Sequence, residues 1–412
     1  MIAAAGEIGD LRLPIRDSSI LYVTSHRFHE QPVNGARLRV LNIARLLARL
    51  GKVSVVIAAD DYDHIDREGL EKTRDEFGSV RVVRVQRDGL RGWRARLRYE
   101  LDPAFLITHY ETVSDSDKRN MLTAIRESDV VWIHTIRTAN LFGVYHWPHS
   151  VLDVDDVPSQ FYASKAGIDA SAARRLFDRR MALIWRRRER LLQNRFSAIT
   201  VCSENDRRYM GGFSNIHVVP NGFATPPQPP HRAPKAPARL GFIGFFDYEP
   251  NREGIEWFIK NVWPRIKRNA PATRLRLIGS GSDRDIPLMG RDIDGLGYVD
   301  DPTDEIASWT AMIIPIRMGG GTRIKVLDAF SRLCPVVSTT LGAFGYAVRD
   351  ENELLLADTV EGFGAACQRL INDPQLGQRL SENAWRRFLT EWTWQGQGGG
   401  VENAVRQCLG AK

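Results

Sequence analysis

The chain has 412 residues, of which 43% are apolar and 26% charged, and its formal net charge is +7. At about 100–200 residues per domain, this length predicts two or three domains. The composition is typical of a globular protein and excludes a disordered chain, a collagen-like chain and a small cysteine-stapled scaffold. No segment approaches the roughly 18 consecutive apolar residues of a membrane-spanning helix, and the N-terminus lacks the basic start of a secretory signal. The four cysteines show no CxxC spacing, which favours a reducing compartment, so we expect the cytoplasm.

The positive charge is concentrated in the first half, where residues 1–230 carry +6 and residues 231–412 carry +1. Residues 90–99 hold four arginines around Trp93, and residues 174–195 hold nine arginines. Either segment could bind an anionic membrane surface, where each Lys or Arg adds about 1 kcal/mol. For the first segment this interpretation and an ordinary solvated surface stay open. For the second we favour a helix whose apolar stripe packs on the domain, formed by Leu176, Met181, Ile184, Leu191 and Leu192. No nucleic-acid motif accompanies the charge, so we expect no nucleic-acid partner.

Short apolar runs alternate with amphipathic stretches, which predicts parallel sheets covered by helices on both faces. In the first half, we expect strands at residues 19–24, 53–59, 80–85, 130–133, 151–154 and 198–201. Helices are expected at residues 36–50, 116–127 and 172–196.

Residues 225–237 contain six prolines, which predicts a linker. Beyond it, we expect strands at residues 240–243, 275–278, 311–316 and 336–338, and helices at residues 251–267, 323–331, 360–372 and 374–389. We therefore expect a first domain at residues 1–224, a linker at 225–238, a second domain at 239–391 and a last helix within 392–412. A glycine-rich break is expected at residues 396–400, and the last helix could return to the first domain. Two such domains place a ligand in the cleft between them.

The segment from Ile313 to Gly345 is the most informative one. A strand is followed by three consecutive glycines, 319–321, and a helix is expected to begin near Thr322. Glycines let backbone N–H groups approach a ligand closely, and a helix N-terminus attracts anions. Arg323 and Lys325 add two positive charges at this point. The segment therefore predicts a diphosphate site.

A carboxylate follows at Asp328, about one and a half helical turns after Arg323. Such a carboxylate can accept hydrogen bonds from vicinal hydroxyls, as acidic residues do with ribose.

Residues 319–345, GGGTRIKVLDAFSRLCPVVSTTLGAFG, resemble the donor-binding signature of retaining glycosyltransferases of the GT-B fold, in glycosyltransferase family 4 (glycosyl transferases group 1). Further segments are similar in order and spacing: LYVTSHRFHEQPVNGARLRVLNIARLLARLG at 21–51, VVPNGF at 218–223, GFIGFFDYEPNREGIEWFI at 241–259, RLRLIGSG at 274–281 and LGYVDD at 296–301. The resemblance implies an α/β fold with two Rossmann-like, doubly wound parallel-sheet domains that face each other across a cleft.

The resemblance also implies roles for single residues. Asp328 stands where the family has the second glutamate of its Glu-x7-Glu pair, the ribose ligand, and Gly320 stands at the first. The implied catalytic residues are Arg323, Lys325 and His134. The implied donor-binding residues are Gly35, Gly319, Gly320, Gly321, Thr322, Asp328, Tyr298 and Val299, with the base held by backbone groups around the last two. Family members usually have glycine at Cys334.

His134 ends an apolar run, and the family has a histidine in a comparable place that points at the donor sugar. Nearby, Asp153, Asp155 and Asp156 imitate the DxD metal motif of a different glycosyltransferase fold. We interpret them as loop caps or acceptor-facing residues, because GT-B enzymes generally need no catalytic metal. We therefore expect no metal and no cofactor beyond the nucleotide-sugar substrate.

The function expected from these residues and the resemblance is transfer of a sugar from a nucleoside-diphosphate sugar to an acceptor hydroxyl, with retention of the anomeric configuration. The acceptor is expected to be a saccharide or lipid-linked group in envelope polysaccharide or glycolipid synthesis, with the protein at the inner face of a membrane. A nucleotide-sugar epimerase and a non-catalytic sugar-nucleotide-binding protein on the same scaffold stay open as alternatives.

Overall fold

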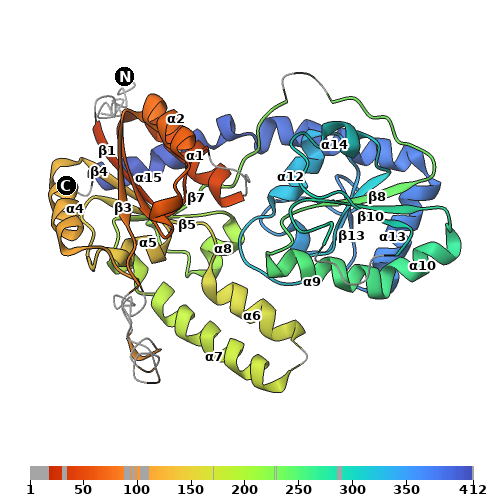
Figure 1. Ribbon diagram of the computed structural model, residues 1–412, viewed down its shortest axis with the longest axis horizontal. Helices are drawn as coiled ribbons and strands as arrows, with labels where there is room; N and C mark the ends of the chain where they lie inside the picture. Colours follow the sequence, from red (N-terminus) through yellow and green to blue (C-terminus); the bar gives the residue numbers. More distant parts are fainter. Residues whose placement is uncertain are drawn as a thin grey trace, which may run out of the picture.

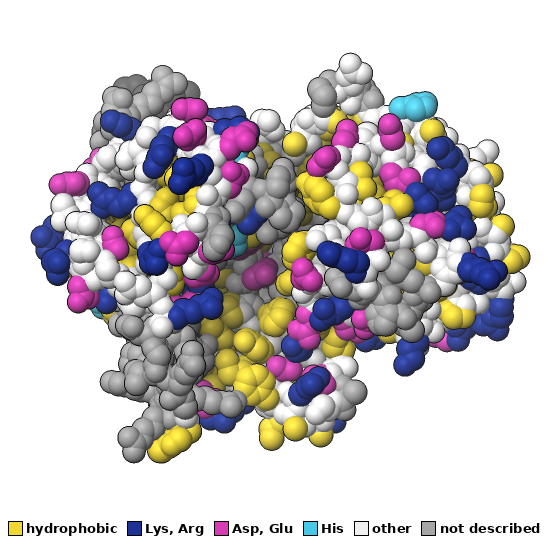
Figure 2. Space-filling view, viewed as in Figure 1, with side chains coloured by type: hydrophobic (Ala, Val, Ile, Leu, Met, Phe, Trp, Pro, Cys, Tyr) yellow, Lys and Arg dark blue, Asp and Glu magenta, His cyan; other side chains and the backbone are white. Residues whose placement is uncertain are grey.

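Apolar runs form the strands of two parallel sheets, one in each half of the chain. The computed structural model describes residues 18–29, 35–87, 93, 97, 100–102, 111–169, 171–226, 228, 230–284 and 290–410. The two sheets and their helices form two domains that face each other (Figure 1). A hollow lies between the domains on the face shown in Figure 2. This is the GT-B arrangement implied by the sequence.

The first domain has the strand order β3-β2-β1-β4-β5-β6-β7, and its paired strands are all parallel. Its strands are β1 Ser18–Thr24, β2 Gly51–Ala59, β3 Ser79–Arg84, β4 Val130–His134, β5 Ser150–Val154, β6 Ala198–Val201 and β7 Ile216–Val218. Its helices are α1 Gly35–Ala48, α2 Arg67–Phe77, α4 Asp115–Glu127, α5 Ile136–Leu141, α6 Pro158–Ile168, α7 Ala172–Glu189 and α8 Glu204–Tyr209, with short 3₁₀ turns η1 Tyr62–His64 and η2 Leu192–Asn194.

The second domain has the parallel order β10-β9-β8-β11-β12-β13. Its strands are β8 Arg239–Ile243, β9 Arg274–Ile278, β10 Ile293–Gly295, β11 Ala311–Ile314, β12 Val336–Ser338 and β13 Leu355–Leu356. Its helical segments are α9 Glu249–Trp257, the π-turn η3 Phe258–Val262, α10 Trp263–Asn269, α11 Thr303–Ala307, α12 Ile324–Ser331, η4 Leu341–Ala343, α13 Val360–Asn372 and α14 Pro374–Glu391.

The end of the chain crosses back to the first domain. After η5 Trp394–Gln397, helix α15 Gly398–Gly410 packs against α1 and β6 (Figure 1). Val401 and Val405 of α15 share a buried core with Ile43 and Leu47 of α1. The expected glycine break is therefore wrong, because three of its glycines form the first turn of this helix.

The α6–α7 hairpin projects from the first domain beside the second (Figure 1). Helix α7 ends at Glu189 rather than at residue 196. The predicted apolar stripe is wrong at one end, because Leu176 is 70% exposed whereas Met181 is buried. Most of the other basic segment, residues 90–99, lies outside the described residues. None of the described helices combines the length and the apolar composition that a bilayer span needs.

Candidate active site

The three glycines between β11 and α12 form a loop at the carboxyl edge of the second sheet. Gly319 has φ of 120° and Gly321 has φ of 66°, which L side chains rarely adopt. Arg323 is the residue that precedes α12, and no side chain caps that helix end. Uncapped N–H groups and the positive end of the helix dipole therefore lie at the loop, as the sequence predicts.

Residues of the first domain cover this loop. The Gly319 N–H donates to Ser164 Oγ of α6 at 2.9 Å, and the Asn221 amide donates to Thr322 Oγ1 at 2.8 Å. A Cβ on Gly321 would collide with the Asp156 carboxylate. The site is thus built from both domains.

The two basic side chains at the start of α12 point in different directions. Arg323 is buried at 8% exposure, and its guanidinium donates to the Gly320 carbonyl at 2.6 Å. Lys325 is half-buried, and its Nζ lies 5.5 Å from the centre of the Phe242 ring. Burial, and then the positive charge of Arg323, lower the pKa of Lys325 to about 7. A diphosphate near these groups would offset that cost.

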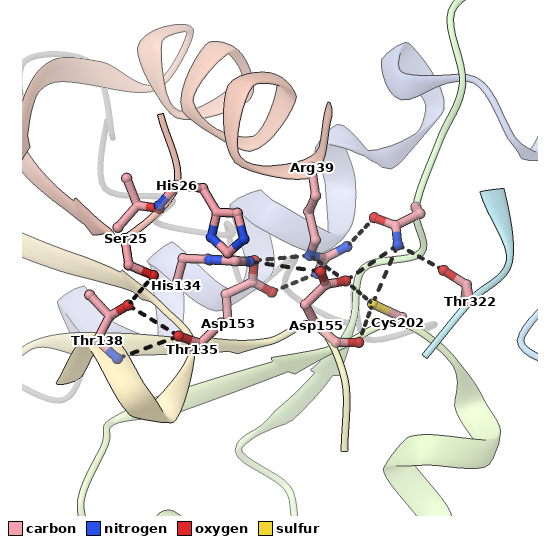
Figure 3. A network of polar contacts seen from close by, with 12 residues as sticks. Ser25, His26, Arg39, His134, Thr135, Thr138, Asp153, Asp155, Cys202 and Thr322 are labelled. Carbon is pink, nitrogen blue, oxygen red and sulfur yellow. Dashed lines mark hydrogen bonds and ion pairs between the residues drawn. The ribbon is translucent and has the colours of Figure 1, made fainter. Parts of the chain in front are cut away.

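A pair of histidines lies at the carboxyl edge of the first sheet (Figure 3). The ring of His134, at the end of β4, packs edge-on against His26, with 5.0 Å between ring centres. The Nε2 of His134 lies 3.9 Å from Asp155 Oδ2, and among the residues that the structure describes neither of its ring nitrogens has a hydrogen-bond partner. Burial, and then the charge of His134, lower the pKa of His26 to about 3. Thr135 has φ of 72°, which is unusual for a β-branched residue and indicates strain beside His134.

Asp153 and Asp155 make different contacts in the site. Asp153 is fully buried, and Arg39 of α1 binds both of its oxygens, at 2.6 and 3.0 Å (Figure 3). The Thr200 hydroxyl donates to the same carboxylate at 2.7 Å. Arg39 also donates to Asn221 Oδ1 at 2.9 Å. Asp153 is therefore a buried partner of Arg39 that stabilises the site and does not face the cleft.

The side chain of Asp155 is less buried than that of Asp153. The Cys202 thiol donates to its backbone carbonyl at 3.2 Å. Burial raises the pKa of Asp155, but the nearby His134 ring and the positive charge of Arg39 outweigh it and hold this pKa well below its usual range. In the described part of the chain, no group of three His, Cys, Asp or Glu side chains is placed to hold a metal ion.

The predicted ribose ligand, Asp328, is paired with the residue that follows its own helix. Its carboxylate accepts from the Arg332 guanidinium one turn later. Its assignment to ribose stays a prediction.

Other predicted donor residues lie at separate edges of the cleft. A Cβ on Gly35, at the start of α1, would lie 3.0 Å from Ile324 Cδ1, so the starts of α1 and α12 meet. Tyr298 is 49% exposed beyond β10, and Val299 packs against the core of the second domain.

Several residues at this site were not singled out from the sequence: His26, Arg39, Ser164 and Asn221. His26 could have been found, because it follows an apolar run as His134 does. Asn221 lies inside the VVPNGF segment, but nothing local to the sequence links it to Thr322.

Comparison with known proteins shows which family and which fold this chain resembles. Residues 237–373 match the family model described as Glycosyl transferases group 1. A glycogen synthase of Mycobacterium tuberculosis is 25% identical over 289 residues, which cover 65% of this chain and 67% of that protein.

Two solved structures resemble the whole chain. Sucrose-phosphate synthase from Thermosynechococcus elongatus has a TM-score of 0.68 at 15% identity, covering 96% of this chain and 100% of that one. Anabaena Alr3699/HepE in complex with UDP-glucose has a TM-score of 0.62 at 13% identity, covering 94% and 99%. Residues 237–373 are therefore similar to the glycosyl transferases group 1 family, and the chain as a whole has the GT-B fold.

Proposed function

We propose that the protein transfers a sugar from a nucleoside-diphosphate sugar to an acceptor hydroxyl. The observation that carries the proposal is the glycine loop at the start of α12, with Arg323 and Lys325 beside it. The loop meets Asp155 and Asp156 of the first domain, and His134 Nε2 lies 3.9 Å from Asp155 Oδ2. HepE, which shares the fold, was solved with UDP-glucose. Retention of the anomeric configuration is proposed from the donor signature, and the anomer of the first-formed product, followed by NMR, tests it.

The proposed mechanism stabilises the leaving diphosphate. Its charge increases in the transition state, where the loop N–H groups, Arg323 and Lys325 supply positive charge. Arg323 would exchange the Gly320 carbonyl for a phosphate oxygen, which is a stronger, charge-assisted partner. No catalytic metal is proposed. The sugar would then react on the side of the first domain, with front-side attack by the acceptor assisted by the leaving phosphate.

The first test is a thermal-shift panel of UDP, ADP and GDP and their sugars, with and without magnesium. A ligand at 100 times its dissociation constant adds about 2.7 kcal/mol of stability, which gives a clear shift. We expect a shift with one base that does not depend on magnesium. In the same panel, Asp328→Ala should weaken that nucleotide about 10- to 100-fold, whereas Asp304→Ala, on exposed α11, should not.

Turnover separates the alternatives. A transferase consumes donor only with an acceptor, an epimerase needs no acceptor, and a binding protein consumes nothing. No shift with any base would refute the donor site.

We also propose that the acceptor is saccharide or lipid-linked, used in envelope polysaccharide or glycolipid synthesis at an anionic inner membrane face. The support is α7, where exposed Leu176 and Leu183 lie among exposed arginines. Phosphatidylglycerol vesicles should co-sediment the protein at low salt. Leu176→Glu with Leu183→Glu should reduce this binding several-fold, and Leu122→Glu, on α4, should not. Equal sedimentation without anionic lipid would contradict the proposal.

A further inference from the structure

Asp156 lies in the middle of the candidate site, and its carboxylate has no partner among the described residues. It follows β5 by two residues, and it is exposed to the cleft. Within the described part of the chain, no hydrogen bond or ion pair reaches its oxygens. Its two acidic neighbours are engaged, since Asp155 faces His134 and Asp206 accepts from Ser203 and Gln160. Asp156 alone is left to bind something else.

The position of Asp156 relative to the glycine loop limits what that ligand can be. A Cβ on Gly320 would lie 3.8 Å from the Asp156 Cβ and 3.3 Å from the Val157 carbonyl oxygen, and one on Gly321 would collide with the carboxylate. The loop therefore brings N–H groups but no side chains to this place. The carboxylate that meets them comes from the opposite domain.

The chemistry of a carboxylate next to an anion site excludes the diphosphate itself as its partner, because the two repel each other. An ionised carboxylate is an acceptor only, and its natural neutral partners are hydroxyl groups. Asp156 is exposed, but the protein on both sides of the cleft leaves less water around its carboxylate than in free solution. This partial desolvation, and then the charge of Asp155, raise the pKa of Asp156 to about 6, while Arg323 and His134 oppose this. At neutral pH it is therefore mostly an acceptor.

We propose that Asp156 accepts hydrogen bonds from hydroxyl groups of the donor sugar and thereby determines which sugars the site binds. The inference rests on the proposed function, since it needs a sugar attached to a diphosphate at the loop. The sugar would lie between Asp156 and His134, whose charges affect each other. Asp156 would then distinguish a nucleoside diphosphate from its sugar conjugate.

The test compares, in each variant, the affinity for a nucleoside diphosphate with the affinity for its sugar conjugate. Dissociation constants are measured by calorimetry at pH 7.5 for UDP and UDP-glucose, ADP and ADP-glucose, and GDP and GDP-mannose. Asp156→Ala should weaken the conjugate that the wild type binds by about 10- to 100-fold, as expected for one or two charge-assisted hydrogen bonds. The affinity for the matching diphosphate should be unchanged or slightly stronger, because a negative charge has been removed.

Two further variants separate hydroxyl binding from charge or folding. Asp156→Glu keeps the charge but moves the carboxyl by one methylene, so it should also lose the preference for the conjugate. Asp75→Asn, on exposed α2, makes a remote change of charge and should behave like the wild type. Equal loss of both ligands, no loss of the conjugate, or a wild type without preference for it would each overturn the inference. If the wild type binds none of the six ligands, the proposed function fails as well.

Discussion

Replacing Lys325 by methionine is expected to lower turnover about 10²- to 10³-fold, the usual effect of removing one charge-stabilising donor from an active site. The charge matters most when the diphosphate leaves, so turnover should fall more than donor binding does. Methionine keeps the apolar stem against Phe242, so folding should be preserved. Rates are measured with saturating donor, and Lys72→Met, on the exposed face of α2, is the matched control.

The pH dependence of nucleotide binding gives a second readout of the same lysine. In the protein alone, burial and Arg323 hold the pKa of Lys325 at about 7. A bound diphosphate would raise that pKa toward its usual value near 10.5. Binding above pH 7 would then take up a proton, so affinity should fall as the pH rises, by up to about tenfold per pH unit.

This dependence should disappear in Lys325→Met and persist in Lys72→Met. Measurements between pH 7 and 9 use the nucleotide sugar, because its diphosphate is a diester without a proton to lose in this range. A methionine variant with wild-type turnover, or with the same slope against pH, would contradict the role given to Lys325.

The part of the site that could be predicted from the sequence is the part whose residues lie close together in the chain. A strand, three glycines and a helix with two early basic residues are read within one segment, because the geometry of a helix start follows from its own residues. The residues of the first domain that contact this loop could not be predicted from the sequence. Ser164 and Asn221 lie about 100–155 residues away, and only the fold brings them to Gly319 and Thr322.

The prediction of a break at residues 396–400 was wrong because it, too, considered only residues close together in the chain. Glycine has a low intrinsic helix propensity, so a run of glycines predicts a break. Here the run lies where α15 approaches the first domain closely. A Cβ on Gly400 would lie 2.7 Å from the Val218 carbonyl oxygen. This close approach requires glycine at residue 400. Packing of α15 against the first domain stabilises the helix despite its glycines, so tertiary structure overrides local propensity.

Arg39 shows what a sequence can and cannot say about a buried charge. It falls on the apolar face of α1, beside Val40 and Ile43, and is completely buried. A buried guanidinium needs a partner, but the sequence does not identify Asp153, 114 residues away. Arg39 donates to Asn221, which in turn donates to Thr322 of the second domain, so this ion pair also positions the donor loop.

Replacing Arg39 by leucine is therefore expected to lower the free energy of unfolding by about 3–5 kcal/mol, because it leaves Asp153 buried without its countercharge. Urea unfolding followed by tryptophan fluorescence measures the loss. Arg45→Leu, on the exposed side of α1, removes a surface ion pair with Glu76 and should cost no more than about 1 kcal/mol.

The cause is tested by removing the second charge. Arg39→Leu combined with Asp153→Leu removes the unpaired carboxylate, so it should recover most of the lost stability. If the double variant were as unstable as the single one, lost packing rather than an unpaired charge would be the cause. The stability of the first domain would then not depend on the ion pair that holds Asn221 toward the donor loop.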